Sequence, residues 1–311
     1  MMFEPNISLI IGVYNEESTI GNLLSSIRAT EYPKEKLEII IIGKCSTDMT
    51  DKIIEYFISE NPQLNIKFLQ DTHKGIGNAR NIGIETSSSD ILTILDGDHM
   101  MTPDYLHKMV APLEDSNIHG SDPIQLISNK ENILARLLWN REYLGDTEYE
   151  PGFRMFRKKV IHLVGMYDNR LAAYDDQITG KANKLGFKSV KADAILYHAY
   201  PGNTRDILNA ARWRGMSLAK VWIWDKQKAI RIGMFPALCI SPLASVLLCI
   251  VNPFFIFGAL PFIFMETVRI KKMYRNDKWK GLLLMPLLDI AEMTYYSFSF
   301  IRGLNYGKAT K

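Results

Sequence analysis

The sequence predicts an α/β fold in which a mostly parallel sheet is covered by helices on both faces. Short apolar runs, of the kind that form buried parallel strands, alternate with segments that have helical spacing. The fourth of these runs stops at two aspartates, and ligands of such sheets bind beyond the carboxyl ends of the strands. The length of 311 residues suits one large domain with a smaller part appended.

The first half of the chain has the strand–helix rhythm that produces parallel strands with helical crossovers. Asn15 and Ser18 follow the first apolar run and are suited to cap the helix after it. The predicted strands cover residues 7–14, 37–43, 65–70 and 90–96, and the predicted helices run to about residue 28, over 46–60 and over 76–87.

The segment from about residue 105 to 205 has a mixed pattern. Helical spacing is present over 134–144 and over 175–186, where Gly186 is expected to end the helix. An apolar strand pattern over 189–198 leads to His198.

The composition excludes several classes of protein. The chain is 47% hydrophobic and 23% charged, close to an ordinary globular protein, and its net charge of +3 is too small to indicate a nucleic-acid partner. The three cysteines are scattered, so they predict neither a disulfide framework nor a metal site. The N-terminal stretch lacks the basic region of a secretory signal, and the catalytic part is therefore expected in the cytosol.

A long apolar run, residues 232–268, predicts a membrane segment. It exceeds the roughly 20 helical residues that cross a bilayer, and Asn252-Pro253 is a turn signal in its middle. Two joined membrane helices or a re-entrant hairpin would fit, and a pair of buried soluble helices is the alternative. Basic residues at both ends of the run favour a hairpin with both flanks in the cytosol.

The apolar segment 281–301 includes Asp289 and Glu292 on one helical face. It is expected to lie along the membrane surface or to span it a third time, and basic residues in the tail favour the surface. The predicted division is a cytosolic domain over 1–230, a membrane part over 231–303 and a tail over 304–311.

The sequence "ILDGDHMM" places Asp96, Gly97 and Asp98 at the carboxyl end of the fourth predicted strand. Two carboxylates this close repel unless a cation offsets their charge. Mg²⁺ or Mn²⁺ fits, because such ions take carboxylate oxygens and keep positions open for substrate phosphates. A solvated turn is the alternative reading of the same three residues.

Five segments in order resemble the inverting family 2 glycosyltransferases, whose domain has the Rossmann-like GT-A fold. They are "SLIIGVYNEESTI", "EIIIIGKCSTDMT", "KGIGNARNIGI", "ILDGDHMMTPDYL" and the long block from "GFRMFRKK" to "DDQITGKANKLGFK". The resemblance spans most of residues 6–225. It implies a nucleotide-sugar donor, whose contacts are expected from Val13, Asn15, Glu16, Asp48, Asp71, Arg80, Asp96 and Gly97.

The resemblance also implies roles in catalysis. Asp98 is expected to bind the metal of the donor diphosphate, and Asp96 to hold it through water or to touch the ribose. Asp176, with Asp175 beside it, stands where the family has the general base that takes a proton from the acceptor hydroxyl. The alternative for these two residues is an acidic pair that favours the helix dipole.

Three further residues are implied in the site. "LNAARWRG" resembles a signature of membrane-linked members, in which Arg212 would pair with the diphosphate and Trp213 would stack on an acceptor sugar. A basic amphipathic helix on the membrane is the alternative. His198 is expected as a metal or phosphate ligand, or else as a structural histidine.

One departure from the family concerns the donor base. Many relatives end the second strand with an aspartate that reads uracil, whereas this chain has Gly43, Lys44 and Cys45 there. The acceptor for the uracil N3–H is therefore missing, and Asp71 is a candidate for the base or ribose contact, or a loop cap.

The expected function is a membrane-bound transfer of a sugar from a nucleoside diphosphate to a hydroxyl acceptor, such as a lipid-linked saccharide or a glycan. A base at Asp176 favours a hydroxyl, because a polyprenyl phosphate acceptor is already anionic. A polyprenyl-phosphate glycosyl synthase is the second enzyme reading. A non-catalytic membrane scaffold that binds nucleotide sugar is the alternative from another class.

Overall fold

The computed structural model describes residues 3–72, 75–143, 151–167, 175–212, 253–277 and 283–308, together with Gly215, Ala244 and Leu247. They belong to two units, the first made of Met1–Ser128 and Glu150–Ala199, the second of Asn129–Tyr149 and Tyr200–Lys311. The domain limits expected at residues 230 and 303 remain a prediction.

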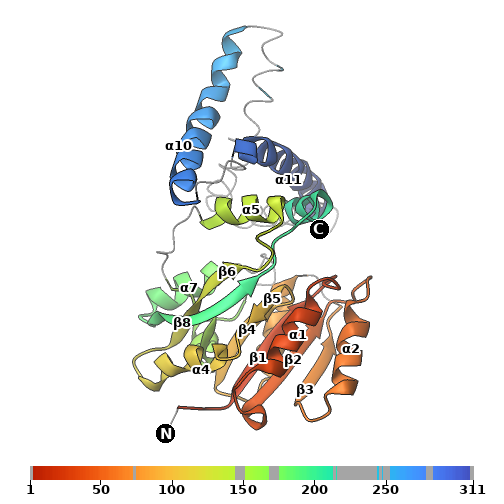
Figure 1. Cartoon of the computed structure of the whole chain (residues 1–311), viewed down its shortest axis with the longest axis vertical. Coiled ribbons are helices and arrows are strands. Elements are labelled where there is room, and N and C mark those ends of the chain that lie inside the picture. The colour runs from red at the N-terminus through yellow and green to blue at the C-terminus, as the bar shows by residue number, and fades with distance from the viewer. Residues whose placement is uncertain are drawn as a thin grey trace. The chain divides into compact units, whose positions relative to one another are not determined.

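One sheet forms the centre of the first unit, and in the described segments its strand order is β3-β2-β1-β4-β7-β6-β8-β5 (Figure 1). Strands β1 to β4 are the four predicted ones, and they pair in parallel as expected. The bounds are β1 Ile7–Val13, β2 Leu37–Gly43, β3 Ile66–Gln70, β4 Ile91–Asp96, β5 His99–Met101, β6 Gly120–Ile127, β7 Met155–Arg157 and β8 Ser189–His198.

The strand β8 was predicted, whereas β5, β6 and β7 were not. Strands β5 and β7 have three residues each, too few to show the alternation of apolar and polar residues that indicates a strand. Strand β7 pairs antiparallel with both β4 and β6, and β5 pairs antiparallel with β8. The α/β class with a mostly parallel sheet is therefore confirmed, with antiparallel pairs added at β7 and β5.

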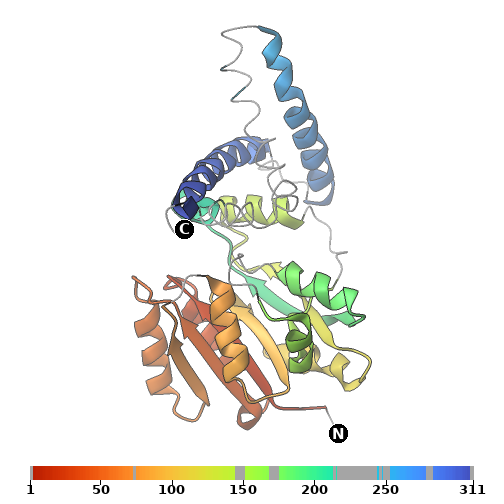
Figure 2. The ribbon, with the colours of Figure 1, turned by 180° about the vertical axis from the view of Figure 1, so that it is seen from behind.

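Helices cover both faces of this sheet. Figure 1 shows α1, α2 and α4 on one face, and Figure 2 shows α3, α6 and α7 on the other. Alternation along β1 explains the two layers, because Leu9 and Ile11 pack with the first set of helices and Ile10 with the second. The helices are α1 Ile20–Ala29, α2 Thr50–Glu60, α3 Ile76–Thr86, α4 Tyr105–Val110, α6 Lys158–Val164 and α7 Asp175–Lys184, with short 3₁₀ turns at Lys34–Lys36 and Ala111–Glu114.

The helix ends depend on local chemistry. The predicted capping of α1 by Asn15 and Ser18 is wrong, since α1 follows Thr19 without a side-chain cap. The predicted end of α7 near Gly186 is confirmed. Gly186 has a φ of 82°, and the Phe187 N–H donates to the Ala182 carbonyl, which closes the helix end.

The second unit contains helices in its described segments. They are α5 Ile133–Tyr143, which was predicted, a helix over residues 204–212, a 3₁₀ turn at Pro253–Ala259, α10 Leu260–Asp277 and α11 Met285–Lys308. Among the described residues, none of the helices combines the length and the apolar character that a bilayer crossing requires. A third span over 281–301 thus has no support, and the predicted hairpin over 232–268 falls largely outside the described segments.

Helices α10 and α11 have acidic side chains inside and apolar side chains outside. Glu266, Asp289 and Glu292 are buried. The Arg269 guanidinium donates to Asp289 at 2.7 Å and also to Glu266, which joins the two helices. The exposed side chains include Leu260, Ile263, Phe264 and Val268 on α10 and Leu287, Phe298 and Ile301 on α11.

Candidate active site

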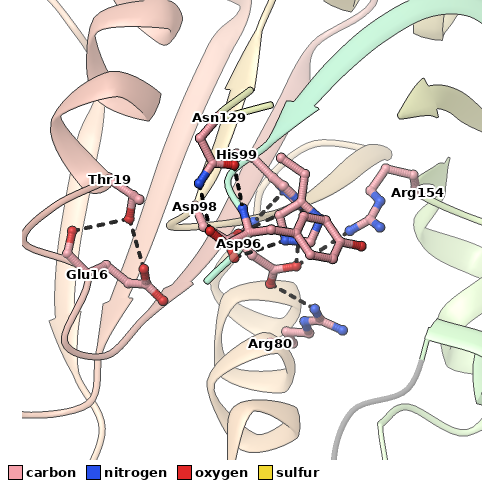
Figure 3. Close-up of polar contacts among 10 residues, drawn as sticks. Glu16, Thr19, Arg80, Asp96, Asp98, His99, Asn129 and Arg154 are labelled. Carbon is pink, nitrogen blue, oxygen red and sulfur yellow. Dashed lines mark hydrogen bonds and ion pairs between the residues drawn. The ribbon is translucent and has the colours of Figure 1, made fainter. Parts of the chain in front are cut away.

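Two arginines face Asp96, the last residue of β4. Arg80, from α3, lies with its Nη2 2.8 Å from Oδ1, and Arg154, just before β7, lies with its Nη1 3.6 Å from Oδ2 (Figure 3). Burial raises the pKa of Asp96, but Arg80, His99 and Arg154 together outweigh this effect, and the pKa lies below its usual range. The protein itself therefore balances the charge of Asp96, which the sequence had led us to expect from a metal.

Asp98 has a different partner. Its Oδ2 lies 3.0 Å from Nε2 of His198, at the end of β8. The Ala199 N–H donates to the Asp98 carbonyl at 2.9 Å, next to the antiparallel pair of His99 and His198. Among the described residues, the buried Oδ1 of Asp98 has no hydrogen-bond partner. That oxygen and the His198 ring are suited to bind a cation.

His99 is buried beside this pair. Its Nδ1 accepts a hydrogen bond from the Asp96 N–H at 3.0 Å. The ring proton of the neutral imidazole must then be on Nε2, which lies 3.9 Å from Asp98 Oδ1 and 4.0 Å from Asp96 Oδ2. Burial lowers the pKa of His99 to about 4, so the ring is neutral at pH 7. In this arrangement His99 directs an N–H toward the two carboxylates.

Asp98, His99 and His198 present ligand atoms that lie within 4.8 Å of one another. His99 cannot bind a cation through Nε2 while its Nδ1 accepts the Asp96 N–H, because one neutral ring has only one free lone pair. The residues that fit a metal ion are therefore Asp98 and His198. A mixed oxygen and nitrogen donor set suits Mn²⁺ better than Mg²⁺.

The Glu16 side chain lies close to Gly97, and Figure 3 shows it beside Thr19. A Cβ at position 97 would lie 2.8 Å from Cγ of Glu16, so glycine is required for this approach. The Thr19 hydroxyl donates to the Glu16 carboxylate at 2.8 Å. Burial, together with the charge of Asp98, raises the pKa of Glu16 to about 8. Glu16 therefore adds a third carboxyl group beside the turn.

Three predicted donor contacts lie at the end of β1 or in the loops after β1 and β2. Asn15, with a φ of 55°, accepts from the Thr47 N–H at 2.8 Å. Asp48 accepts from the Thr50 N–H at 3.0 Å and the Glu17 N–H at 3.2 Å. The Val13 carbonyl accepts from the Lys44 N–H at 3.1 Å. These bonds join the two loops, and donor contacts by the same residues remain a prediction.

Asp71 follows β3 and is buried in an ion pair. Its Oδ2 lies 2.6 Å from the Lys44 ammonium and accepts from the Asn78 amide at 3.0 Å. The exposed fraction of the side chain is 1% for Asp71 and 11% for Lys44. Lys44 is one of the three residues in the region where many relatives have the base-reading aspartate. It is the ion-pair partner of Asp71, the candidate for the base or ribose contact.

The structure describes only some of the residues that were predicted to contact the acceptor or the diphosphate. Asp175 and Asp176 open α7, but their side chains lie outside the described part, as does Trp213. Arg212 is exposed at the end of the helix over 204–212 in the second unit.

Sequence reasoning missed Arg154 and His99. His99 could have been suspected from its place directly after the two aspartates. Arg154 has no local signal, because only the pairing of β7 with β4 brings it beside Asp96.

Comparison with known proteins finds similar glycosyltransferases. The chain is 27% identical over 238 residues to glycosyltransferase AglE of Haloferax volcanii, covering 73% of this chain and 78% of that protein. It is 29% identical over 196 residues to poly-beta-1,6-N-acetyl-D-glucosamine synthase of Staphylococcus aureus, covering 58% of this chain and 47% of that one. The structure of mannosyltransferase PcManGT from Pyrobaculum calidifontis, in complex with GDP-Man and Mn²⁺, is similar with a TM-score of 0.62 at 19% identity, covering 96% and 88% of the two chains.

Residues 8–175, more than half of the chain, match the family described as glycosyl transferase family 2. That range contains every one of the predicted donor-binding residues and Asp98. The chain belongs to glycosyl transferase family 2 and is a glycosyltransferase.

Proposed function

We propose that this protein moves a sugar, with inversion, from a nucleoside diphosphate to a hydroxyl acceptor such as a lipid-linked saccharide or a glycan. The observation that supports it most directly is the contact between Asp98 and His198 at the carboxyl end of β4. A buried oxygen of Asp98 lies there with no hydrogen-bond partner in the described part of the chain. The similar Pyrobaculum structure contains GDP-Man and Mn²⁺.

Each residue of the site is assigned a separate role in this reaction. Asp98 and His198 would hold Mn²⁺ or Mg²⁺, a Lewis acid that stabilises the leaving diphosphate when bound. His198 would bind the cation through a ring nitrogen that carries no proton, with the ring proton on the other nitrogen. Arg80 and Arg154 keep Asp96 ionised and in place. Asp176 takes the proton of the acceptor hydroxyl as that oxygen attacks the anomeric carbon.

The second unit is proposed to bind the membrane, with the catalytic unit on the cytosolic side. Phe264, Leu287 and Phe298 have exposed side chains, with exposed fractions of 72%, 68% and 68%. The acidic side chains described on the same two helices, those of Glu266, Asp289 and Glu292, are buried. Apolar surface of this kind is stabilised in the interface of a bilayer.

A donor screen tests the reaction. The full chain is incubated with Mn²⁺ or Mg²⁺ and a panel of nucleotide sugars, and release of nucleoside diphosphate is measured with and without a chelator. We expect release that stops when the cation is removed. Donor binding without transfer to any acceptor would favour the scaffold, and activity that survives the chelator would contradict the assigned site.

Flotation with liposomes tests the membrane proposal. Substituting Phe264, Leu287 and Phe298 together by serine is expected to reduce the floated fraction. Tyr56→Ser with Leu163→Ser is the matched control, because these side chains of the first unit are also exposed, at 68% and 65%. Equal flotation of both variants would contradict a lipid-binding α10–α11 pair.

A further inference from the structure

The ion pair of Lys44 and Asp71 lies at the carboxyl ends of β2 and β3. The Asp71 side chain is nearly inaccessible, the Lys44 side chain is 11% exposed, and the ammonium and carboxylate are 2.6 Å apart. The Asp71 N–H donates to the Gly43 carbonyl at 2.8 Å, and the Lys44 N–H donates to the Val13 carbonyl. Backbone bonds thus hold both residues at the same edge of the sheet as Asp98.

A buried ion pair adds little to stability, because the loss of hydration offsets most of the attraction. The same two strands have another ion pair at their amino ends, between Lys67 and Glu38 at 2.7 Å. That pair lies on the opposite edge from the site, and its lysine is 43% exposed. The Lys44 pair is distinguished by its place on the substrate edge.

The distance along this edge fits a nucleotide. Strands in a sheet lie about 4.8 Å apart, and the order β3-β2-β1-β4 puts β2 two strands and β3 three strands from β4. With the diphosphate held near Asp98, the nucleoside reaches the ends of β2 and β3, about 10–14 Å away by the same spacing. The base then contacts the edge where Lys44 lies.

We propose that Lys44, fixed by Asp71 and Asn78, contacts the base of the donor and selects guanine over uracil. This inference rests on the proposed function. A lysine ammonium has three N–H donors and no acceptor. Guanine offers it two adjacent acceptors, N7 and O6, and lysine is a common partner of that edge.

Uracil and adenine match this ammonium less well. Uracil has an N3–H donor between its two carbonyl groups, and that donor needs an acceptor. The aspartate that supplies it in many relatives is absent here, where Gly43, Lys44 and Cys45 stand in that region. Adenine places an amino group beside N7, which directs a donor at the ammonium. Cytosine presents its O2 and N3 as adjacent acceptors, and the binding test therefore includes CDP. Asp71 cannot take over freely, since its Oδ2 is used by Lys44 and Asn78.

Titration calorimetry of the full chain with Mn²⁺ and GDP, UDP, CDP or ADP tests the inference without requiring turnover. We expect the unmodified protein to bind GDP at least 10-fold more tightly than UDP. Lys44→Met is expected to weaken GDP binding about 10-fold or more, the loss for one good contact to a base edge, and to change UDP binding little. Lys44→Arg should restore most of the preference.

Lys67→Met is the matched control, because it breaks the ion pair at the other end of the same strands and should leave the GDP-to-UDP ratio unchanged. If Lys44→Met does not fold, the variant with both Lys44→Met and Asp71→Asn removes the two charges together and should lose the preference as well. The inference would be overturned if the unmodified protein bound UDP more tightly than GDP, or if the GDP-to-UDP ratio stayed the same without Lys44. The proposed function would stand in either case. Failure of every nucleotide to bind would refute the proposed function and this inference with it.

Discussion

Oδ2 of Asp98 lies 3.0 Å from Nε2 of His198, although 100 positions separate the two residues along the chain. The antiparallel pairing of β5 with β8 produces this contact, because it places His99 opposite His198. The two aspartates after β4 are consequently not equivalent. Asp96 is held by arginines, while Asp98 has a histidine beside it and a buried oxygen without a hydrogen-bond partner among the described residues.

Asp98→Asn is expected to abolish turnover that depends on Mn²⁺ or Mg²⁺, because an amide is a poor ligand for a hard cation. Nucleoside diphosphate release and Mn²⁺ binding would be measured on the same preparation. Asp193→Asn is the control, since the side chain of Asp193 is 90% exposed on β8. Mn²⁺ binding that is unchanged in Asp98→Asn would refute the assigned ligand.

Asp176→Asn is expected to spare donor binding and to reduce sugar transfer to a hydroxyl acceptor by about 10²-fold or more, the usual contribution of a general base. Donor affinity and transfer rate would be measured separately. A variant with full transfer activity would move the acceptor from a hydroxyl to a phosphate, which needs no base.

In the presence of a chelator, Glu16→Gln is expected to have a higher melting temperature than the unmodified protein at pH 8. At pH 5 the difference between the two proteins should be smaller. The pKa of Glu16 is raised to about 8, whereas in the unfolded chain this carboxyl group has its ordinary pKa of 4.5. Between these values the unfolded state loses the proton and the folded state keeps it, so the free energy of unfolding falls as the pH rises. Glutamine removes this loss.

The difference between these two pKa values corresponds to several kcal/mol, at about 1.4 kcal/mol per pH unit. The expected gain at pH 8 is therefore at least about 2–4 °C, the shift that roughly 1 kcal/mol produces in a domain of this size. Scanning calorimetry at several pH values would measure it. Parallel pH curves for the two proteins would show that Glu16 is ionised in the folded state across this range.

Gly97→Ala is expected to lower the free energy of unfolding by about 1–3 kcal/mol, because the new Cβ would overlap the Glu16 side chain. Urea unfolding would measure the loss. Gly180→Ala, where a Cβ meets nothing within 4 Å, is the control. Adding Glu16→Ala to Gly97→Ala should recover most of the stability, and no recovery would show that the overlap is not the cause.

Local pattern was enough to predict much of this fold. The apolar runs of β1, β2 and β4, which are buried on both faces, are readable within a window of a few residues. Gly186 at the end of α7 and the acidic turn at Asp96 and Asp98 can also be recognised locally. A glycine with positive φ and a pair of carboxylates are identified by residue type alone.

Only the tertiary structure decided what surrounds that turn. Arg80 and Arg154 reach Asp96 through the packing of α3 and the pairing of β7 with β4, and His198 reaches Asp98 through β8. The capping predicted for Asn15 failed for the same reason, since its side chain binds Thr47 in a neighbouring loop. Such contacts join segments that are far apart in the chain. They form because burial of the whole sheet fixes which strand ends meet, and a window of a few residues does not contain this information.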